Sequence, residues 1–164
     1  MKQLVISFAL CGLALGAAAQ TMWRDAPLLA SQAQINELMP QARPTSPQQR
    51  AATPSALLEI PSTSIAGEDF SATYHFESDQ LQRIELAATP PSRKRRQALL
   101  QTLQASLQKN YGLPISTKIR PAAALGAVDL MWDYRRMTVQ LLTLQGNEVA
   151  LIYSVSQPRQ AQGL

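Results

Sequence analysis

The sequence predicts an α+β fold in which an antiparallel sheet of about five or six strands packs against one or two helices. Three observations lead to this prediction. Aromatic and polar residues alternate over residues 70–77, as in a half-buried strand. Leucines recur at helical spacing over residues 93–111, and Gly146-Asn147 separates two apolar runs as in a β-hairpin. We therefore expect one domain in which strands and helices share a core.

The first nineteen residues have the pattern of a secretory signal peptide. Met1-Lys2 gives a basic start, residues 4–15 are apolar, and Ala17-Ala18-Ala19 forms a small-residue cleavage site before Gln20. The apolar run is shorter than the roughly 20 residues of a membrane-spanning helix. Cys11 lies inside this run, without the Leu-small-small triplet that precedes an acylated cysteine in bacterial lipoproteins. We expect residues 1–19 to be removed, which leaves a periplasmic or secreted protein with no stable membrane anchor.

Composition limits the remaining classes. After removal of residues 1–19, about 145 residues remain, which is enough for one hydrophobic core. They contain no cysteine, so this core must form without disulfides. The formal charge of +4 falls to about +3 when Lys2 is lost, too small an excess to indicate nucleic acid as a partner. No phosphate loop, metal-ligand cluster or cofactor motif is present, so we expect no cofactor and no metal.

Residues 20–55 are predicted to hold a short helix and a connector. Apolar residues between Leu28 and Met39 recur at helical spacing, Ser31 is a suitable N-cap, and Pro40 ends the helix. Residues 40–55 contain four prolines, and we expect them to be extended, without helix or strand pairing. Residues 56–156 then form the α+β domain, and residues 157–164 a flexible tail.

The first strands follow this connector. Residues 57–60 begin the sheet, and residues 70–77 place Phe70, Tyr74 and Phe76 on one face. Residues 78–80 supply a turn, after which Ile84, Leu86 and Ala88 give the returning strand its apolar face. Leu81 is out of phase with this strand, so we expect a bulge or the hairpin end there.

The strongest helix prediction covers residues 93–111. Ser92 is the expected N-cap, Gly112 follows the helix, and Pro114 prevents its continuation. The buried stripe should consist of leucines at spacings of three and four, with Tyr111 at its end: Leu100, Leu103 and Leu107.

Residues 128–134, 137–144 and 148–155 are predicted to be the last three strands. A two-residue turn at Gly146-Asn147 would pair the last two strands so that both faces of this hairpin are apolar. In that register the first face carries Leu142, Leu144, Val149 and Leu151, and the second carries Val139, Leu141, Ala150 and Ile152. We expect one face to pack on the 93–111 helix, and the other beneath the N-terminal helix and connector or another molecule.

Helix and strands thus occur twice, which suggests a degenerate tandem repeat. Residues 35–44 resemble residues 107–114, and the hairpin around Phe76 resembles that around Trp132. This helix-on-meander layout resembles β-lactamase inhibitor proteins and outer-membrane assembly lipoproteins. Tyr111-Gly112-Leu113-Pro114 followed by a Trp132-bearing strand is similar to uncharacterised proteobacterial periplasmic α+β domains. The resemblance implies an envelope protein, and it assigns a role to no residue.

A basic run at the start of the 93–111 helix is the clearest candidate binding site. Arg93, Lys94, Arg95 and Arg96 present charge suited to carboxylate or phosphate on an anionic partner. The alternative is a solvated helix face, since successive residues lie 100° apart and cannot share one side. Four cations also oppose the positive end of the helix dipole.

A second candidate combines aromatic and basic residues. Trp132 and Tyr134 point to the same face of a strand, and Arg135 and Arg136 follow them directly. Trp, Tyr and Arg are the residues that most often anchor protein partners. The alternative for Trp132 is a place in the core.

An enzyme is the weaker prediction. His75 is the single histidine, at a polar-face position of its strand, where Glu77 is able to orient it. No nucleophile motif accompanies it, and a surface histidine is the simpler interpretation. Asp129 and Asp133 lack the spacing of a calcium loop or of a fixed glycosidase pair.

These observations favour an exported, non-enzymatic binding or accessory protein of the bacterial cell envelope that recognises a protein or an anionic polymer. A structural subunit of an envelope complex is a variant of the same prediction. The alternative from another class is a small periplasmic hydrolase that uses scattered acids and His75.

Overall fold

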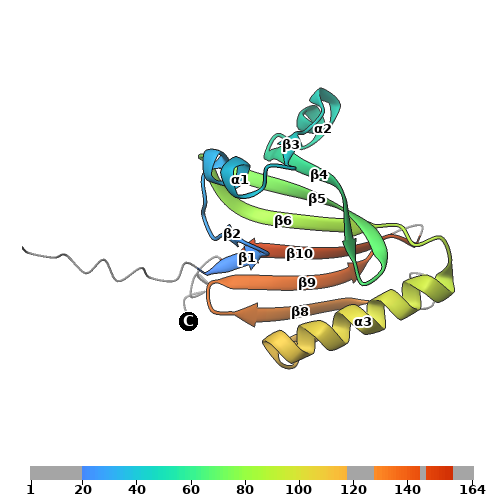
Figure 1. Cartoon of the computed structure of the whole chain (residues 1–164). Coiled ribbons are helices and arrows are strands. Elements are labelled where there is room, and N and C mark those ends of the chain that lie inside the picture. The colour runs from blue at the N-terminus through green and yellow to red at the C-terminus, as the bar shows by residue number, and fades with distance from the viewer. Residues whose placement is uncertain (1–19, 118–127, 145–146, 157–164) are drawn as a thin grey trace, which may run out of the picture.

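The computed structural model describes residues 20–117, 128–144 and 147–156 (Figure 1). The predicted signal peptide and the predicted tail at 157–164 lie outside the described residues. None of the helices in the described part is long and apolar enough to cross a membrane.

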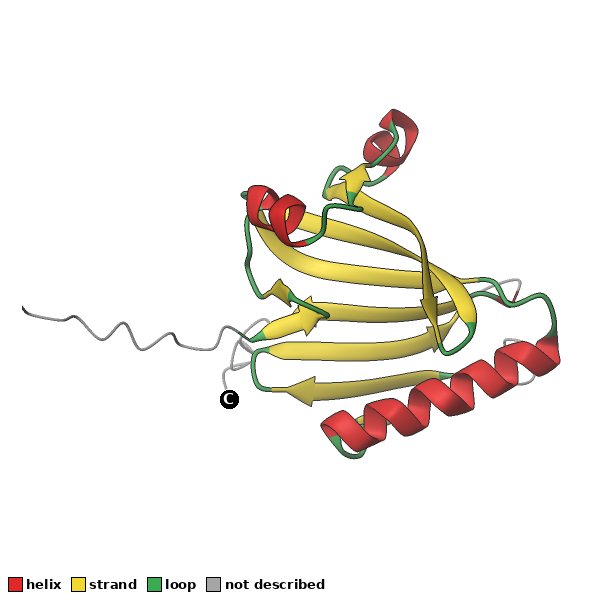
Figure 2. Cartoon of the chain, in the orientation of Figure 1, coloured by secondary structure: helices red, strands yellow, loops and turns green. Residues whose placement is uncertain are grey.

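The described residues form an α+β fold, as predicted, built around one antiparallel sheet (Figure 2). Six long strands match the expected number, and a two-residue strand is added at each edge. A separate pair, β1 (Thr21–Trp23) and β2 (Ala26–Pro27), precedes the sheet. In spatial order the sheet contains β3 (Arg43–Pro44), β4 (Ala56–Ile65), β5 (Glu68–Glu77), β6 (Gln80–Ala88), β10 (Val149–Val155), β9 (Met137–Thr143), β8 (Asp129–Tyr134) and β7 (Ser116–Thr117).

Two three-stranded meanders make up most of this sheet. The first contains β4, β5 and β6, the second contains β8, β9 and β10, and they join where β6 pairs with β10. Helix α3 (Arg93–Tyr111) carries the chain from the end of β6 to the far edge, so that the second meander returns toward the first. The repeated order of helix and strands that the sequence suggests is therefore present in the topology.

One face of the sheet holds the core, and α1 (Gln32–Leu38) and α3 both cover it. The hydroxyl of Tyr74 donates to the sulfur of Met39, just after α1, at 3.5 Å, while Trp132 donates to the carbonyl of Gly112, just after α3, at 2.9 Å. Tyr74 and Trp132 lie on the same face, because consecutive cross-strand pairs connect them. The expectation that the N-terminal helix covers the opposite face is therefore wrong. The cross-strand pairs that connect Tyr74 with Trp132 run through Ile84, Tyr153 and Val139.

The last hairpin also differs from the prediction in register. Val149 pairs with Thr143, and the N–H of Leu144 donates to the carbonyl of Glu148 at 2.9 Å. Three residues rather than two therefore lie between this last hydrogen-bonded pair, and Asn147 takes a positive φ of 75°. This one-residue shift moves alternate side chains to the other face, so Leu141 and Leu151 share the core. The opposite face is mixed, with half-buried Leu142 and Ile152 beside polar residues, and the prediction of two apolar faces is wrong.

The proline-rich segment is more ordered than predicted. Residues 47–52 form α2 (Pro47–Ala52), for which Ser46 is the N-cap and Pro47 the first residue. Proline fits this position because the first helical N–H has no intrahelical partner. Pro44 sits in β3 at the edge of the sheet, where a missing donor costs little. The prediction of a connector without helix or strand pairing is therefore wrong.

The predicted N-cap at Ser31 and the predicted bulge near Leu81 are both confirmed. Ser31 forms a capping box with Gln34 at the start of α1. Ser78 and Asp79 both take positive φ between β5 and β6. Beside them the pairing slips by one residue, which turns Leu81 into the core as predicted for a bulge.

Candidate functional site

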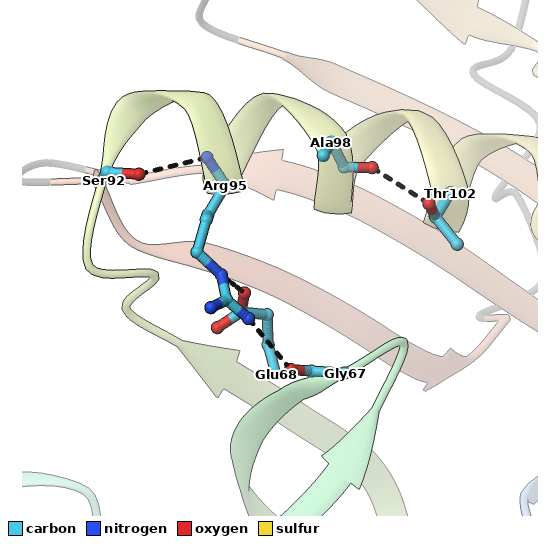
Figure 3. A network of polar contacts seen from close by, with 6 residues as sticks. All are labelled: Gly67, Glu68, Ser92, Arg95, Ala98 and Thr102. Carbon is cyan, nitrogen blue, oxygen red and sulfur yellow. Dashed lines mark hydrogen bonds and ion pairs between the residues drawn. The ribbon is translucent and has the colours of Figure 1, made fainter.

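The basic start of α3 is divided among three environments. Ser92 caps the helix through the backbone N–H of Arg95 (Figure 3). The Arg95 side chain then donates to Glu68 Oε1 at 2.6 Å and to the Gly67 carbonyl at 3.4 Å. Both acceptors lie at the turn between β4 and β5. Arg95 thus ties α3 to the sheet, and its charge is already paired within the protein.

Arg93 and Arg96 line an open groove beside α3. Its volume is about 430 Å³, within the usual size range of ligand sites. Lys94 is exposed and is not among the described residues that line the groove. The four cations therefore do not act as one surface. The rest of the described lining consists of Gln97, Leu100, Gln101, Gln104 and Val128.

Three glutamines give this groove its polar character. Gln97, Gln101 and Gln104 follow Arg93 at spacings of four, four and three, so they lie on one stripe of the helix. Each amide offers two donors and an acceptor, and each guanidinium offers a planar fork of donors. Such a lining suits carboxylates together with hydroxyl or amide groups. The sequence prediction missed the glutamines, although their helical spacing after Arg93 is a signal for them.

The second predicted cluster does not form one surface. Trp132 is 1% exposed and its indole N–H is bonded, so it belongs to the core and is not an anchor for a partner. Tyr134 is half-buried, and its ring meets that of Tyr111 edge-on at 5.3 Å. Arg135 lies over the Tyr134 ring at 5.2 Å, and Arg136 completes the turn between β8 and β9.

The two basic clusters lie at opposite ends of α3 (Figure 1). A 19-residue helix is about 28 Å long, so no small ligand contacts both clusters at once. Arg93 and Arg96 remain with the groove, whereas Arg135 and Arg136 belong to the end where α3 finishes.

His75 is buried rather than on the surface. His75 is 9% exposed, and its Nδ1 lies 3.2 Å from Ser55 Oγ. Its Nε2 lies 3.9 Å from Glu85 Oε2, and Arg83 forms an ion pair with the same carboxylate. Glu77, the predicted partner, is exposed and lies opposite Gln80 at the hairpin end. The register of the strands therefore places Glu85 of β6, and not Glu77, beside the imidazole.

The environment of His75 lowers the pKa of its imidazole. Burial is the main cause, the Arg83 charge adds to it, and the Glu85 charge opposes both. A small cavity of about 140 Å³ adjoins the imidazole and Glu85, with Gln49 and Thr53 of the α2 region on its wall. Ser55 is not among the described residues that line this cavity.

The acidic residues give no metal centre in the described part of the chain. No group of three or more His, Cys, Asp or Glu side chains gathers there. Asp129 accepts from the Gln140 amide at 2.8 Å, and Asp133 accepts from the Ser156 hydroxyl at 3.2 Å.

Comparison with known proteins gives one weak structural neighbour. No family model matches the chain, and no curated protein matches it in sequence. Among solved structures it is similar to YjgB from Bacillus subtilis, a DUF4309 family protein, with a TM-score of 0.44 and 13% identity. The match covers 77% of this chain and 78% of that chain.

Proposed function

We propose that this chain is an exported, non-enzymatic binding protein of the bacterial cell envelope, and that the groove beside α3 binds a carboxylate-bearing polymer. The observation that carries the proposal is the combination of Arg93 and Arg96 with three glutamines in one groove. Arginine binds carboxylates through paired, charge-assisted hydrogen bonds. The glutamines supply donors and acceptors for the hydroxyl or amide groups of the same polymer.

Two further features support a binding role for the groove. Arg95 holds the start of α3 on the β4–β5 turn, so the helix that carries the groove is fixed in place. The described lining contains only Arg, Gln, Leu and Val side chains. None of these is a general base or a nucleophile at neutral pH.

A paired-variant binding experiment tests this proposal. The probe is a polygalacturonate oligomer, and its affinity is measured by calorimetry at low and at moderate salt. We expect Arg93→Gln with Arg96→Gln to weaken binding by about tenfold or more, since each charge-assisted bond contributes about 1.5–3 kcal/mol. Salt should weaken binding of the natural protein because exposed charges are screened.

Lys94→Gln provides the matched control, because Lys94 is exposed on the same turn and is not among the described lining residues. This variant should bind the oligomer with unchanged affinity. Equal affinity for the double variant and the natural protein would reject the groove. Binding of an acidic peptide in preference to the oligomer would identify a protein as the partner instead.

A hydrolase is the second candidate, and one observation favours it. Ser55, His75 and Glu85 form a chain of contacts that resembles the order of a catalytic triad. A fluorophosphonate probe tests this possibility directly. Labelling that disappears in Ser55→Ala and in His75→Gln would establish a nucleophilic serine. We expect no labelling, since the hydroxyl is not among the described residues that line the adjacent cavity.

Export is part of the same proposal and has its own test. The protein recovered from the periplasmic fraction should have the intact mass of a chain that begins at or within a few residues of Gln20. A full-length species in the inner membrane would contradict cleavage.

A further inference from the structure

The end of the molecule where α3 finishes carries exposed apolar side chains. Leu113 is 81% exposed and Ile115 is 57% exposed, although both belong to a loop that the sheet holds in place. The backbone N–H of Ile115 donates to the carbonyl of Met131 at 2.8 Å, and the carbonyl of Gly112 accepts from Trp132 at 2.9 Å. The loop is therefore fixed at both ends, and it presents two large aliphatic side chains to solvent.

Three basic residues belong to the elements next to this loop. Lys109 lies in the last turn of α3, and Arg135 and Arg136 form the neighbouring turn between β8 and β9. The contact between Tyr111 and Tyr134, at 5.3 Å between ring centroids, joins these two elements at the same end (Figure 1). We call this region, made of Lys109, Leu113, Ile115, Arg135 and Arg136, the apolar-basic end.

The chain also enters the fold at this end. Gln20 follows the apolar leader in the sequence, and its side-chain amide donates to the carbonyl of Tyr134 at 3.3 Å. The first described residue is therefore held beside the turn that carries Arg135 and Arg136.

We propose that the apolar-basic end binds the surface of an anionic lipid bilayer reversibly. Leu113 and Ile115 enter the boundary between headgroups and acyl chains, and the three cations contact lipid phosphates. Apolar insertion combined with electrostatic attraction is the usual basis of peripheral membrane binding. In this mode the protein stays at the surface and no segment of the apolar-basic end crosses the bilayer. The α3 groove, at the other end of the helix, stays available to its ligand.

Vesicle sedimentation with the exported protein tests this inference. Vesicles of phosphatidylcholine with phosphatidylglycerol should bind the protein, and vesicles of phosphatidylcholine alone should bind it less. We expect Leu113→Ser with Ile115→Ser to weaken partitioning by about tenfold or more, because two aliphatic side chains no longer insert. Lys109→Glu with Arg136→Glu should weaken binding to the anionic vesicles and leave binding to neutral vesicles unchanged.

The chain offers a matched control for loss of exposed apolar area. Leu38 on α1 and Leu144 after β9 are 47% and 41% exposed, so Leu38→Ser with Leu144→Ser removes similar groups elsewhere. That variant should bind vesicles as the natural protein does. Absence of vesicle binding, or unchanged binding by the Leu113 and Ile115 variant, would overturn the inference. The Arg93 and Arg96 variant should retain vesicle binding, so failure of the groove proposal is recognised separately.

Discussion

His75 illustrates how position in the sheet alters the chemistry of one side chain. The alternation of its strand predicts a polar face, and the structure confirms that face. The imidazole is nevertheless buried, because Ser55, which precedes β4, and Arg83 and Glu85 of β6 lie around it. None of these three residues lies close to His75 in the sequence, so pattern alone does not identify them.

The lowered pKa of His75 predicts a loss of stability in mild acid. The unfolded chain binds a proton near the ordinary pKa of 6.5, while the folded protein binds it only at lower pH. The stabilising contribution is therefore complete above 6.5 and is lost as pH falls from 6.5 toward the lower folded pKa. Urea unfolding at a series of pH values measures this loss.

His75→Gln keeps a polar side chain of similar size and removes the titration. Its stability should change less than that of the natural protein over the same pH interval. An equally steep acid dependence in the variant would assign the effect to other groups.

Trp132 is a core residue whose indole N–H needs a hydrogen-bond acceptor. Trp132→Phe removes the indole N–H that the Gly112 carbonyl accepts and leaves a small void at a position that is 1% exposed. We expect the free energy of unfolding to fall by about 1–3 kcal/mol, from the lost bond and the lost packing. Chemical denaturation measures the change, and a variant as stable as the natural protein would contradict this account.

At the scale of elements, the helices follow local sequence more closely than the loops do. The predicted bounds of α3 agree with the structure, because Ser92, the leucine spacing and Gly112 all lie within or beside the helix. The β9–β10 hairpin differs by one residue, since the number of loop residues depends on how both strands meet the rest of the sheet. Strand β4 also departs from regular pairing. It has a bulge where Pro61 and Ser62 interrupt its pairing with β5.

The end of α3 depends on the backbone freedom of Gly112. Its φ of 82° and ψ of −157° fall in a region that is essentially restricted to glycine. A Cβ at this position would meet nothing within 4 Å, so Gly112→Ala acts through backbone strain alone. We expect it to lower the free energy of unfolding by about 1–3 kcal/mol in chemical denaturation.

Asn110→Ala is a suitable comparison for Gly112→Ala. Asn110 is exposed in the last turn of the same helix, and its replacement should change stability by less than about 0.5 kcal/mol. Equal stability of the two variants would show that Gly112 is not needed for this turn.

At the scale of the whole molecule, the N-terminal residues belong to the same core as the strands. Ile35 and Met39 are at most 2% exposed, and they pack in one cluster with residues of both meanders. Residues between Met22 and Met39 therefore cover the core itself, whereas we expected this segment on the opposite face of the sheet.

Deletion of residues 20–55 should expose this core. The shortened chain is expected to bind a hydrophobic dye and to associate, because an uncovered apolar sheet face is prone to aggregation. Dye fluorescence and size-exclusion chromatography measure both effects. A monomeric product that binds no dye would contradict the shared core.

The sequence by itself determined the class of fold, a sheet of about five or six strands, and α3 with its limits, because these depend on spacing and capping within a few residues. It also pointed to the basic helix start as the most conspicuous charge. The tertiary structure alone decided that Arg95 pairs with Glu68, that Trp132 is buried, and that His75 meets Glu85 rather than Glu77. It also placed α1 and α3 on one face of the sheet. These outcomes depend on strand register and on contacts between distant segments, which local pattern does not encode.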